Sequence, residues 1–442
     1  MKKVKTIFLV LFISSLLNAQ TITINDLPAG TYNKLEFNDD QKRNIETQSE
    51  SFTHLPKVDK VNKLYPDGRL SSTTFWPAGS WGRGYHTKPK VNFYSKNADG
   101  YYFACHPLMR DVSCFLRGHL HLYLSGYTSG NSLTLTKNGI DYILAEQVKK
   151  GSDKGGFIWW KKRAGRKNLR MNPPVNKTHA YETAYALTAL SEYYLSQIPY
   201  KRTEVFEAIQ NASLNLINTD WDSKGVNNSN MKGLAIWSLA SAYKVTADSS
   251  TLNKIKQLTN FLIDLQTTTD NDQNGVWLTG GIENINGYKI YHDTKIFYHL
   301  FILRGLSEVF SITAEGDSDF KNELAITIKR SVNHLINHRL DTTNVNAAHM
   351  KYAHKTIDEK TTPGWFVNEP EASEIPIETM VKLAYYSNGS DYFTTREKIN
   401  LKNLANKISG GLNDLEKWHM CGIGYYINYM NTINNSIVPG RK

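Results

Sequence analysis

The chain has 442 residues, of which 40% are hydrophobic, and its 52 Lys and Arg outnumber 41 Asp and Glu to give a formal net charge of +11. Its three cysteines, Cys105, Cys114 and Cys421, are too few for a disulfide-stabilised scaffold and have no zinc-motif spacing. Disulfide-rich and zinc-finger classes are therefore excluded, while the length allows a large core and up to two domains.

The first 19 residues have the pattern of a secretory signal peptide. Three lysines precede an apolar run over residues 7–17, and Asn18-Ala19 supplies a small-residue cleavage point. The run is too short for a membrane span and has the wrong flanks. We therefore expect a soluble, secreted or periplasmic protein with no membrane insertion. We also expect no lipid anchor, because the residue directly after the cleavage point is not a cysteine.

The positive charge persists after cleavage, because removing three signal-peptide lysines leaves 49 − 41 = +8. A secreted basic protein meets little nucleic acid, so we expect an anionic polysaccharide or oligosaccharide as the partner of a monomeric protein. The alternative is that the charge serves solubility alone. Residues 20–60 lack helical periodicity and are predicted to form an extended arm, followed by one domain over 61–442.

From about residue 100, the chain alternates two kinds of predicted helix. One kind is apolar on most sides and follows a polar loop rich in Gly, Asn, Asp and Trp; the other keeps a single apolar stripe and a charged face. The first kind is predicted at 101–126, 179–196, 231–246, 290–312, 375–387 and 418–430, and the second at 133–148, 204–218, 250–267, 322–340 and 399–412.

This alternation predicts an all-α fold with two concentric rings of helices, an (α/α)6-like toroid. An open solenoid is the alternative, but it favours more uniform repeats than these units of about 40 to 60 residues. The layout over residues 100–430 resembles that of the α/α-toroid carbohydrate-active enzymes, which include toroid polysaccharide lyases and six-hairpin glycosidases. The resemblance implies parallel inner helices whose N-terminal loops line a substrate cleft.

Unusual residues gather in these loops and first turns. Aromatic side chains stack on sugar rings, and several helix N-termini at one place favour anions. Core covering, solvated loops and N-capping are the alternative interpretations. The predicted substrate-binding residues are Arg110, Trp159, Trp160, Arg166, Arg170, Asn230, Lys232, Trp277, Tyr288, Trp365 and Glu371. The predicted catalytic residues are His179, Tyr181, Glu182, Tyr291, His292, Asp293 and Lys295.

The segment IYHDTKIFYHL is interpreted as the start of an inner helix. On such a helix, His292, Lys295 and His299 share one face. Lys295 would then lower the pKa of His292 and make it a general base, whereas His299 lies two turns deeper and is expected to be a hydrogen-bonded core histidine.

The leading functional hypothesis is β-elimination on a uronate-containing polysaccharide resembling alginate, pectate or glucuronan. This reaction requires neutralisation of the carboxylate, a base for the C5 proton and an acid for the leaving oxygen. The first alternative is a glycoside hydrolase, including an unsaturated uronyl hydrolase, which needs two carboxyl groups. The second is a glycan-binding toroid without activity. We expect no cofactor and no metal.

The positions of two cysteines provide a test of whether the ring of inner helices closes. Cys105 and Cys421 each open an inner helix, and the first and last helices of a closed ring are neighbours, so these two residues are expected to lie close together. Cys114 is expected to be a buried thiol.

Overall fold

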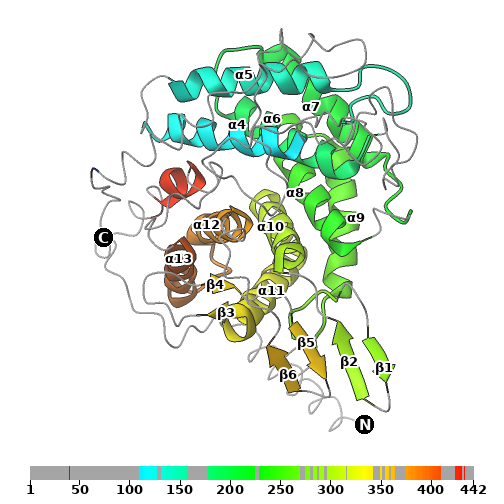
Figure 1. Ribbon diagram of the computed structural model, residues 1–442, viewed down its shortest axis with the longest axis vertical. Helices are drawn as coiled ribbons and strands as arrows, with labels where there is room; N and C mark the ends of the chain where they lie inside the picture. The colour runs from blue at the N-terminus through cyan, green and yellow to red at the C-terminus, as the bar shows by residue number, and fades with distance from the viewer. Residues whose placement is uncertain are drawn as a thin grey trace, which may run out of the picture.

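The computed structural model consists mainly of helical hairpins (Figure 1). Apart from Asp39 and Ile433, the residues that the structure describes are 109–126, 131–157, 178–223, 228–268, 274–278, 282–285, 288–292, 296–314, 316–341, 349–350, 354–357, 360–363, 374–409 and 424–430. The predicted signal peptide and arm, except Asp39, and the predicted cysteine pair, Cys105 and Cys421, lie outside this part.

Inner helices alternate with outer helices along the chain. The inner helices are α4 (Met109–Leu124), α6 (Ala180–Leu195), α8 (Ser229–Thr246), α10 (Ile296–Ile312) and α12 (Glu374–Asn388). The outer helices are α5 (Asn131–Glu146), α7 (Arg202–Ile217), α9 (Ser249–Leu265), α11 (Ser318–His334) and α13 (Thr395–Ser409). The boundaries predicted for the outer helices lie within four residues of the observed ones, except that α11 ends at His334 rather than at residue 340.

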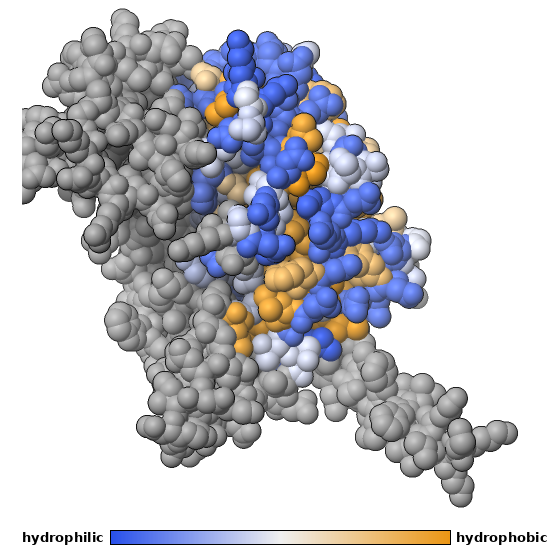
Figure 2. Space-filling view, turned by 90° about the vertical axis from the view of Figure 1, so that its right-hand side faces the viewer, coloured by the Kyte–Doolittle hydropathy of each residue, from blue (hydrophilic) through white to orange (hydrophobic). Residues whose placement is uncertain are grey.

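Burial separates the two layers as the hydrophobic patterns predicted. Helix α6 buries nearly every residue from Ala180 to Tyr193, whereas α7 buries only one stripe of its surface. The same contrast separates α8 from α9. Among the residues that are coloured in Figure 2, polar surface dominates, with apolar patches between. Leu214 of α7 and Phe261 of α9 are among the exposed apolar side chains, so the outer layer is amphipathic.

The inner helices form a closed ring. Consecutive inner helices pack against each other from α4 to α12, and α8 and α10 approach so closely that a Cβ on Gly305 would lie 2.2 Å from the backbone oxygen of Gly233. The helix 424–430 lies between α12 and α4 (Figure 1). Its Tyr425 contacts Arg117 of α4, and its Tyr429 contacts Tyr385 of α12. The predicted toroid of helical hairpins is thereby confirmed.

The loops that connect the helices differ strongly in length between the two ends of the ring. The turns from an inner helix to the following outer helix are short, as between α8 and α9, where only Ala247 and Asp248 intervene. The segments that lead from an outer helix into the next inner helix are long, and 30 residues separate the end of α9 from the start of α10. Most connecting residues of the described hairpins therefore belong to the segments that precede the inner helices in the chain.

Two long connections also contribute β-structure that the sequence interpretation did not predict. The strands β1 (Ile282–Ile285), β2 (Tyr288–His292), β5 (His354–Ile357) and β6 (Lys360–Pro363) form an antiparallel sheet in the order β1-β2-β5-β6. A five-residue π-helix, Leu335–Arg339, leads from α11 into β3 (Leu340–Asp341), which pairs with β4 (His349–Met350). The described fold is thus helical with two small sheets.

The segment 290–312 is not one helix, as the sequence interpretation expected. Residues 288–292 are strand β2, in which Tyr291 pairs with Ile282 of β1 and with Thr356 of β5. Helix α10 starts only at Ile296. Because β2 pairs with a strand on each side, its backbone N–H and C=O groups form hydrogen bonds within the sheet instead of within a helix. The shared helical face of His292, Lys295 and His299 therefore does not exist.

A repeated turn follows two of the outer helices. The side-chain amide of Gln147 donates to the backbone oxygens of Gly155 and Ala208, and that of Gln266 donates to those of Gly275 and Thr327. Gly155 and Gly275 have φ values of +86° and +87° against a neighbouring outer helix, where a Cβ would collide with backbone. The turn ends in a buried aromatic residue, Phe157 in one copy and Trp277 in the other.

Candidate functional site

Four predicted site residues meet at the N-terminal ends of α4 and α6. We call Arg110, His179, Tyr181 and Glu182 the entrance cluster. The backbone N–H of Arg110 donates to Glu182 Oε2 at 2.9 Å, and its guanidinium Nη1 lies 3.7 Å from Glu182 Oε1. The same guanidinium lies 5.3 Å from the centroid of the Tyr181 ring. Two neighbouring inner helices thus fix one arginine between a carboxyl group and an aromatic face.

Glu182 is fully buried beneath the first turn of α4. Burial raises the pKa of its carboxyl group, although Arg110 and the backbone N–H groups of Arg110 and Met109 act in the opposite direction. A carboxylate at a helix N-terminus satisfies amides that have no partner within the helix. Glu182 therefore caps α4 from α6 and sets the position of Arg110.

His179 is the N-cap residue of α6, and its Nδ1 accepts the backbone N–H of Tyr181 at 3.2 Å. Burial, together with the positive charge of the nearby Arg110, lowers the pKa of His179 to about 4. The imidazole is therefore neutral near pH 7. Because Nδ1 is the acceptor, the proton of the neutral ring lies on Nε2. This tautomer suits hydrogen-bond donation by Nε2 and disfavours His179 as a general base.

Two other predicted residues, Trp277 and Lys232, are placed differently from what the sequence suggested. Trp277 has no exposed surface, and its indole N–H donates to the backbone oxygen of Leu262 at 2.7 Å. Lys232 is buried and donates to the backbone oxygen of Trp221 at 2.9 Å. Neither side chain therefore has the exposed cleft position that the sequence interpretation assumed: the repeated turn folds Trp277 inward, and Lys232 is bonded to the segment after α7. Asn230 remains at the start of α8, and its buried Oδ1 has no hydrogen-bond partner among the described residues.

The remaining candidates are only partly described. Tyr288, Tyr291 and His292 belong to strand β2, and His292 pairs with Lys355 of β5 four positions before the first residue of α10. His292 thus stays at the entrance end of the ring, although not on a helix. Trp159, Trp160, Arg166, Arg170, Asp293, Lys295, Trp365 and Glu371 lie outside the described residues.

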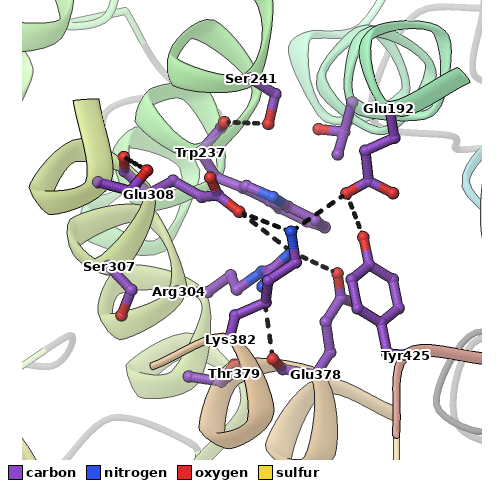
Figure 3. A network of polar contacts seen from close by, with 12 residues as sticks. Glu192, Trp237, Ser241, Arg304, Ser307, Glu308, Glu378, Thr379, Lys382 and Tyr425 are labelled. Atoms are coloured by element: carbon purple, nitrogen blue, oxygen red, sulfur yellow. Dashed lines mark hydrogen bonds and ion pairs between the residues drawn. The ribbon is translucent and has the colours of Figure 1, made fainter. Parts of the chain in front are cut away.

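A second polar group occupies the axis of the ring. We call Arg117, Glu192, Arg304, Glu308, Glu378, Lys382 and Tyr425 the axial network, and Figure 3 labels all of these residues except Arg117. Arg304 Nη2 lies 2.7 Å from Glu378 Oε1, and Arg117 Nη2 contacts the same oxygen. The two guanidinium groups each lie 4.8 Å from the ring centroid of Trp237. Side chains from α4, α6, α10, α12 and the helix 424–430 thus meet around Trp237, which belongs to α8.

The charges of the axial network are balanced and buried. Three cations, Arg117, Arg304 and Lys382, meet three carboxyl groups of Glu192, Glu308 and Glu378, and all six are less than 10% exposed. Burial alone would raise the pKa of Glu308, but Lys244, Lys382 and Arg304 lower it well below its usual range. Apart from Tyr425, the network therefore consists of acidic and basic side chains that pair with one another.

The axial network lies deeper than the entrance cluster. Glu192 follows Glu182 by ten residues on α6, which corresponds to about 15 Å along the helix. Between them, Tyr185 packs edge-on against Phe301 of α10, at 6.4 Å between ring centroids, and Tyr181 of the entrance cluster packs against the same Phe301 ring at 6.0 Å. Because aromatic side chains separate the two groups and the deeper one is internally paired, the entrance cluster is the better candidate for ligand binding.

Sequence reasoning missed most of the axial network. The available signal was a charged residue inside an otherwise apolar stretch, as at Arg304 in FILRGLSEVF, followed by Glu308 one turn later. Such a pattern shows that a buried charge needs a partner. It does not show which helix across the ring supplies that partner.

His299 and Cys114 have the environments that the sequence predicted. His299 is fully buried, its Nε2 lies 2.7 Å from Ser331 Oγ, and burial lowers its pKa to about 3. Cys114 is 2% exposed. Among the described residues, no group of three or more His, Cys, Asp and Glu side chains has a geometry that could hold a metal ion. No helix in the same part combines the length and apolar composition needed to cross a membrane.

No family of known proteins matches the sequence, and no curated protein is detectably similar to it. Solved structures are similar at low identity. A glycoside hydrolase family 76 mannosidase from Bacteroides thetaiotaomicron has 11% identity and a TM-score of 0.49 over 90% of this chain and 98% of its own. A glycosyl hydrolase family 88 protein from Bacteroides vulgatus has 10% identity and a TM-score of 0.48 over 75% of this chain and 93% of its own.

A cellobiose 2-epimerase from Bacillus thermoamylovorans is also similar, with 12% identity and a TM-score of 0.45 over 85% of this chain and 87% of its own. The similar solved structures are thus carbohydrate-active enzymes, as the predicted resemblance in layout expected. At TM-scores below 0.5, these similarities carry no argument about the activity of this chain. The toroid itself rests on the helix contacts described above.

Proposed function

We propose that this chain is a secreted carbohydrate-active enzyme that binds a uronate-containing oligosaccharide at the entrance end of its helical ring. The observation that carries the proposal is the fixed position of Arg110. Its guanidinium is held by Glu182 and Tyr181 where α4 and α6 begin, and its side chain is 11% exposed. A planar guanidinium donates two parallel hydrogen bonds to a carboxylate.

The surroundings of Arg110 support an anionic ligand. The N-termini of α4 and α6 lie beside it, and helix N-termini carry partial positive charge. Burial raises the pKa of Glu182 and thereby weakens the tendency of this carboxyl group to cancel the charge of Arg110. The chain as a whole also carries a positive net charge. A uronate carboxylate has the charge and the geometry to occupy this position.

Glycoside hydrolysis is the reaction that we favour. β-Elimination needs a base, and the two histidines predicted for that role have lost their supporting geometry. Nδ1 of His179 already accepts a backbone N–H, and His292 lies on a strand rather than beside Lys295 on a helix. Hydrolysis instead requires two carboxyl groups on either side of the scissile bond. We propose Asp293 and Glu371, which precede α10 and α12 in the chain, as this pair.

A product assay tests the proposal. The purified protein is incubated with alginate, pectate, glucuronan and glycosaminoglycans, and with unsaturated oligosaccharides prepared from them. Hydrolysis of intact chains produces reducing ends without a gain in near-ultraviolet absorbance. Hydrolysis of an unsaturated uronyl end removes the existing absorbance of its C4–C5 double bond. A gain in this absorbance would overturn the hydrolase assignment in favour of β-elimination, and no product from any uronate substrate would overturn the proposed function.

A further inference from the structure

A pocket of about 440 Å³ lies on the outer side of the entrance cluster. Its walls are the turn 151–154, the start of α6 at Thr178 and His179, and one stripe of α7. This volume falls within the usual range for small-molecule sites, about 300–1,000 Å³. His179 belongs both to this pocket and to the entrance cluster, so the two sites adjoin.

Asparagine side chains dominate the α7 wall. Asn211, Asn215 and Asn218 follow one another at helical spacings of four and three residues, which places them on one face. Asn215 Nδ2 donates to the backbone oxygen of Lys154 at 3.3 Å and thereby joins this wall to the turn. No hydrogen bond of the side-chain amides of Asn211 and Asn218 occurs within the described part of the chain.

The pocket also contains an exposed apolar side chain. Leu214 lies between the asparagines on α7 and is 54% exposed, although a leucine on an outer helix usually packs inward. Asp153 and Lys154 contribute one negative and one positive charge to the lining, so the lining carries no net charge. Apart from these two opposite charges, the pocket therefore offers a ligand amide groups, hydroxyl groups and one apolar surface.

We infer that this pocket, which we call the α7 pocket, is a binding subsite for a neutral sugar residue of a longer oligosaccharide. A sugar hydroxyl both donates and accepts hydrogen bonds, and an asparagine amide offers both functions. The less polar C–H face of a pyranose ring suits the exposed surface of Leu214. A carboxylated residue gains nothing from a lining without net charge, in contrast to its gain beside Arg110.

The inference rests on the proposed function and narrows its substrate class. A glycan that lies across His179 would place an acidic residue near Arg110 and a neutral residue in the α7 pocket. The preferred substrate is therefore a heteropolysaccharide in which uronate and neutral residues are neighbours. Homopolymers of uronate satisfy only one of the two sites.

Calorimetric titration of the full chain tests the α7 pocket separately from the entrance cluster. The probes are neutral tetrasaccharides of glucose, mannose and xylose, and acidic tetrasaccharides of galacturonate and glucuronate. The double variant Asn211→Ala/Asn218→Ala should weaken binding of the neutral probe that binds best about 10-fold, as expected for the loss of two neutral hydrogen bonds. Leu214→Ser provides a second variant at an exposed position and should weaken the same probe.

Asn260→Ala is the matched control, because Asn260 is an exposed asparagine of α9 outside the pocket. It should bind all probes as the unchanged protein does. Arg110→Gln should lose affinity for acidic probes alone. The inference is overturned if no neutral probe binds, or if the double variant and Leu214→Ser bind neutral probes normally. If neutral probes depend on the asparagines while no acidic probe binds, the α7 pocket stands and the uronate assignment fails.

Discussion

Gly424 and Gly118 lie so close together that a Cβ on Gly424 would come within 2.4 Å of the backbone oxygen of Gly118. This contact joins the helix 424–430 to α4, and so it joins the last inner helix to the first. One turn further along the same two helices, Asn428 Nδ2 lies 3.1 Å from His121 Nδ1. The closed ring therefore depends on a residue without a side chain at its seam.

Gly424→Ala should open or distort this seam. The added methyl group meets backbone rather than a flexible side chain, so the helices must move apart, and we expect a loss of about 1–3 kcal/mol in the free energy of unfolding. Gly389→Ala is the control, because a Cβ there meets nothing within 4 Å. Urea unfolding of both variants provides the measurement. Equal stability of the two variants would show that the seam is not closely packed.

The axial network should be intolerant of losing a single charge. Glu378→Gln removes the carboxylate that Arg117 and Arg304 share and leaves two buried guanidinium groups underpaired. We expect a loss of about 3–5 kcal/mol in the free energy of unfolding. Lys256→Gln breaks a partly exposed pair with Asp317 and should cost at most about 1 kcal/mol. Similar losses in both variants would mean that the network contributes nothing beyond ordinary surface ion pairs.

The free energy of unfolding should fall as the pH drops below 6.5, at pH values that are still too high to protonate ordinary carboxyl groups. Burial lowers the pKa of His119 and of His299 to about 3, from an ordinary value of 6.5. These residues stay neutral in the folded state, whereas the unfolded chain binds protons below pH 6.5. Each such histidine should cost about 1.4 kcal/mol of stability at pH 5.5.

Unfolding free energies at pH 7.5 and 5.5 test this expectation for the unchanged protein and for His299→Gln. The variant should lose less stability than the unchanged protein between the two pH values, because one of the buried histidines no longer titrates. Glutamine also retains a hydrogen-bonding group near Ser331. An identical pH dependence in both proteins would show that His299 is not buried as a neutral ring.

The helical framework was predictable because it depends on local periodicity. Helix α6 begins within one residue of its expected start, since His179 caps it and the apolar residues that follow bury nearly every side of the helix. The turn from α9 was harder to predict. Trp277 stands in a polar, Gly-containing loop, but the amide of Gln266 folds that loop against α11 and carries the indole into the core.

The candidate site was predictable only where it lay at helix starts. Arg110 and Glu182 are 72 residues apart, and their meeting follows from the ring arrangement that the periodicity indicated. The start of α10 was misplaced, although the dipeptide Asn286-Gly287 between β-prone residues signals a hairpin. The pairing of Glu378 with both Arg117 and Arg304 joins three helices across the axis, and no sequence spacing encodes it.

Turnover of a uronate-containing oligosaccharide by Arg110→Gln tests most directly whether the entrance cluster binds the substrate. The variant should keep the fold, because the backbone N–H of Arg110 still donates to Glu182. Loss of a charged hydrogen-bonding partner for the carboxylate should lower kcat/KM about 10- to 100-fold. Turnover of the same substrate at the unchanged rate, in a variant whose melting temperature is also unchanged, would contradict the account.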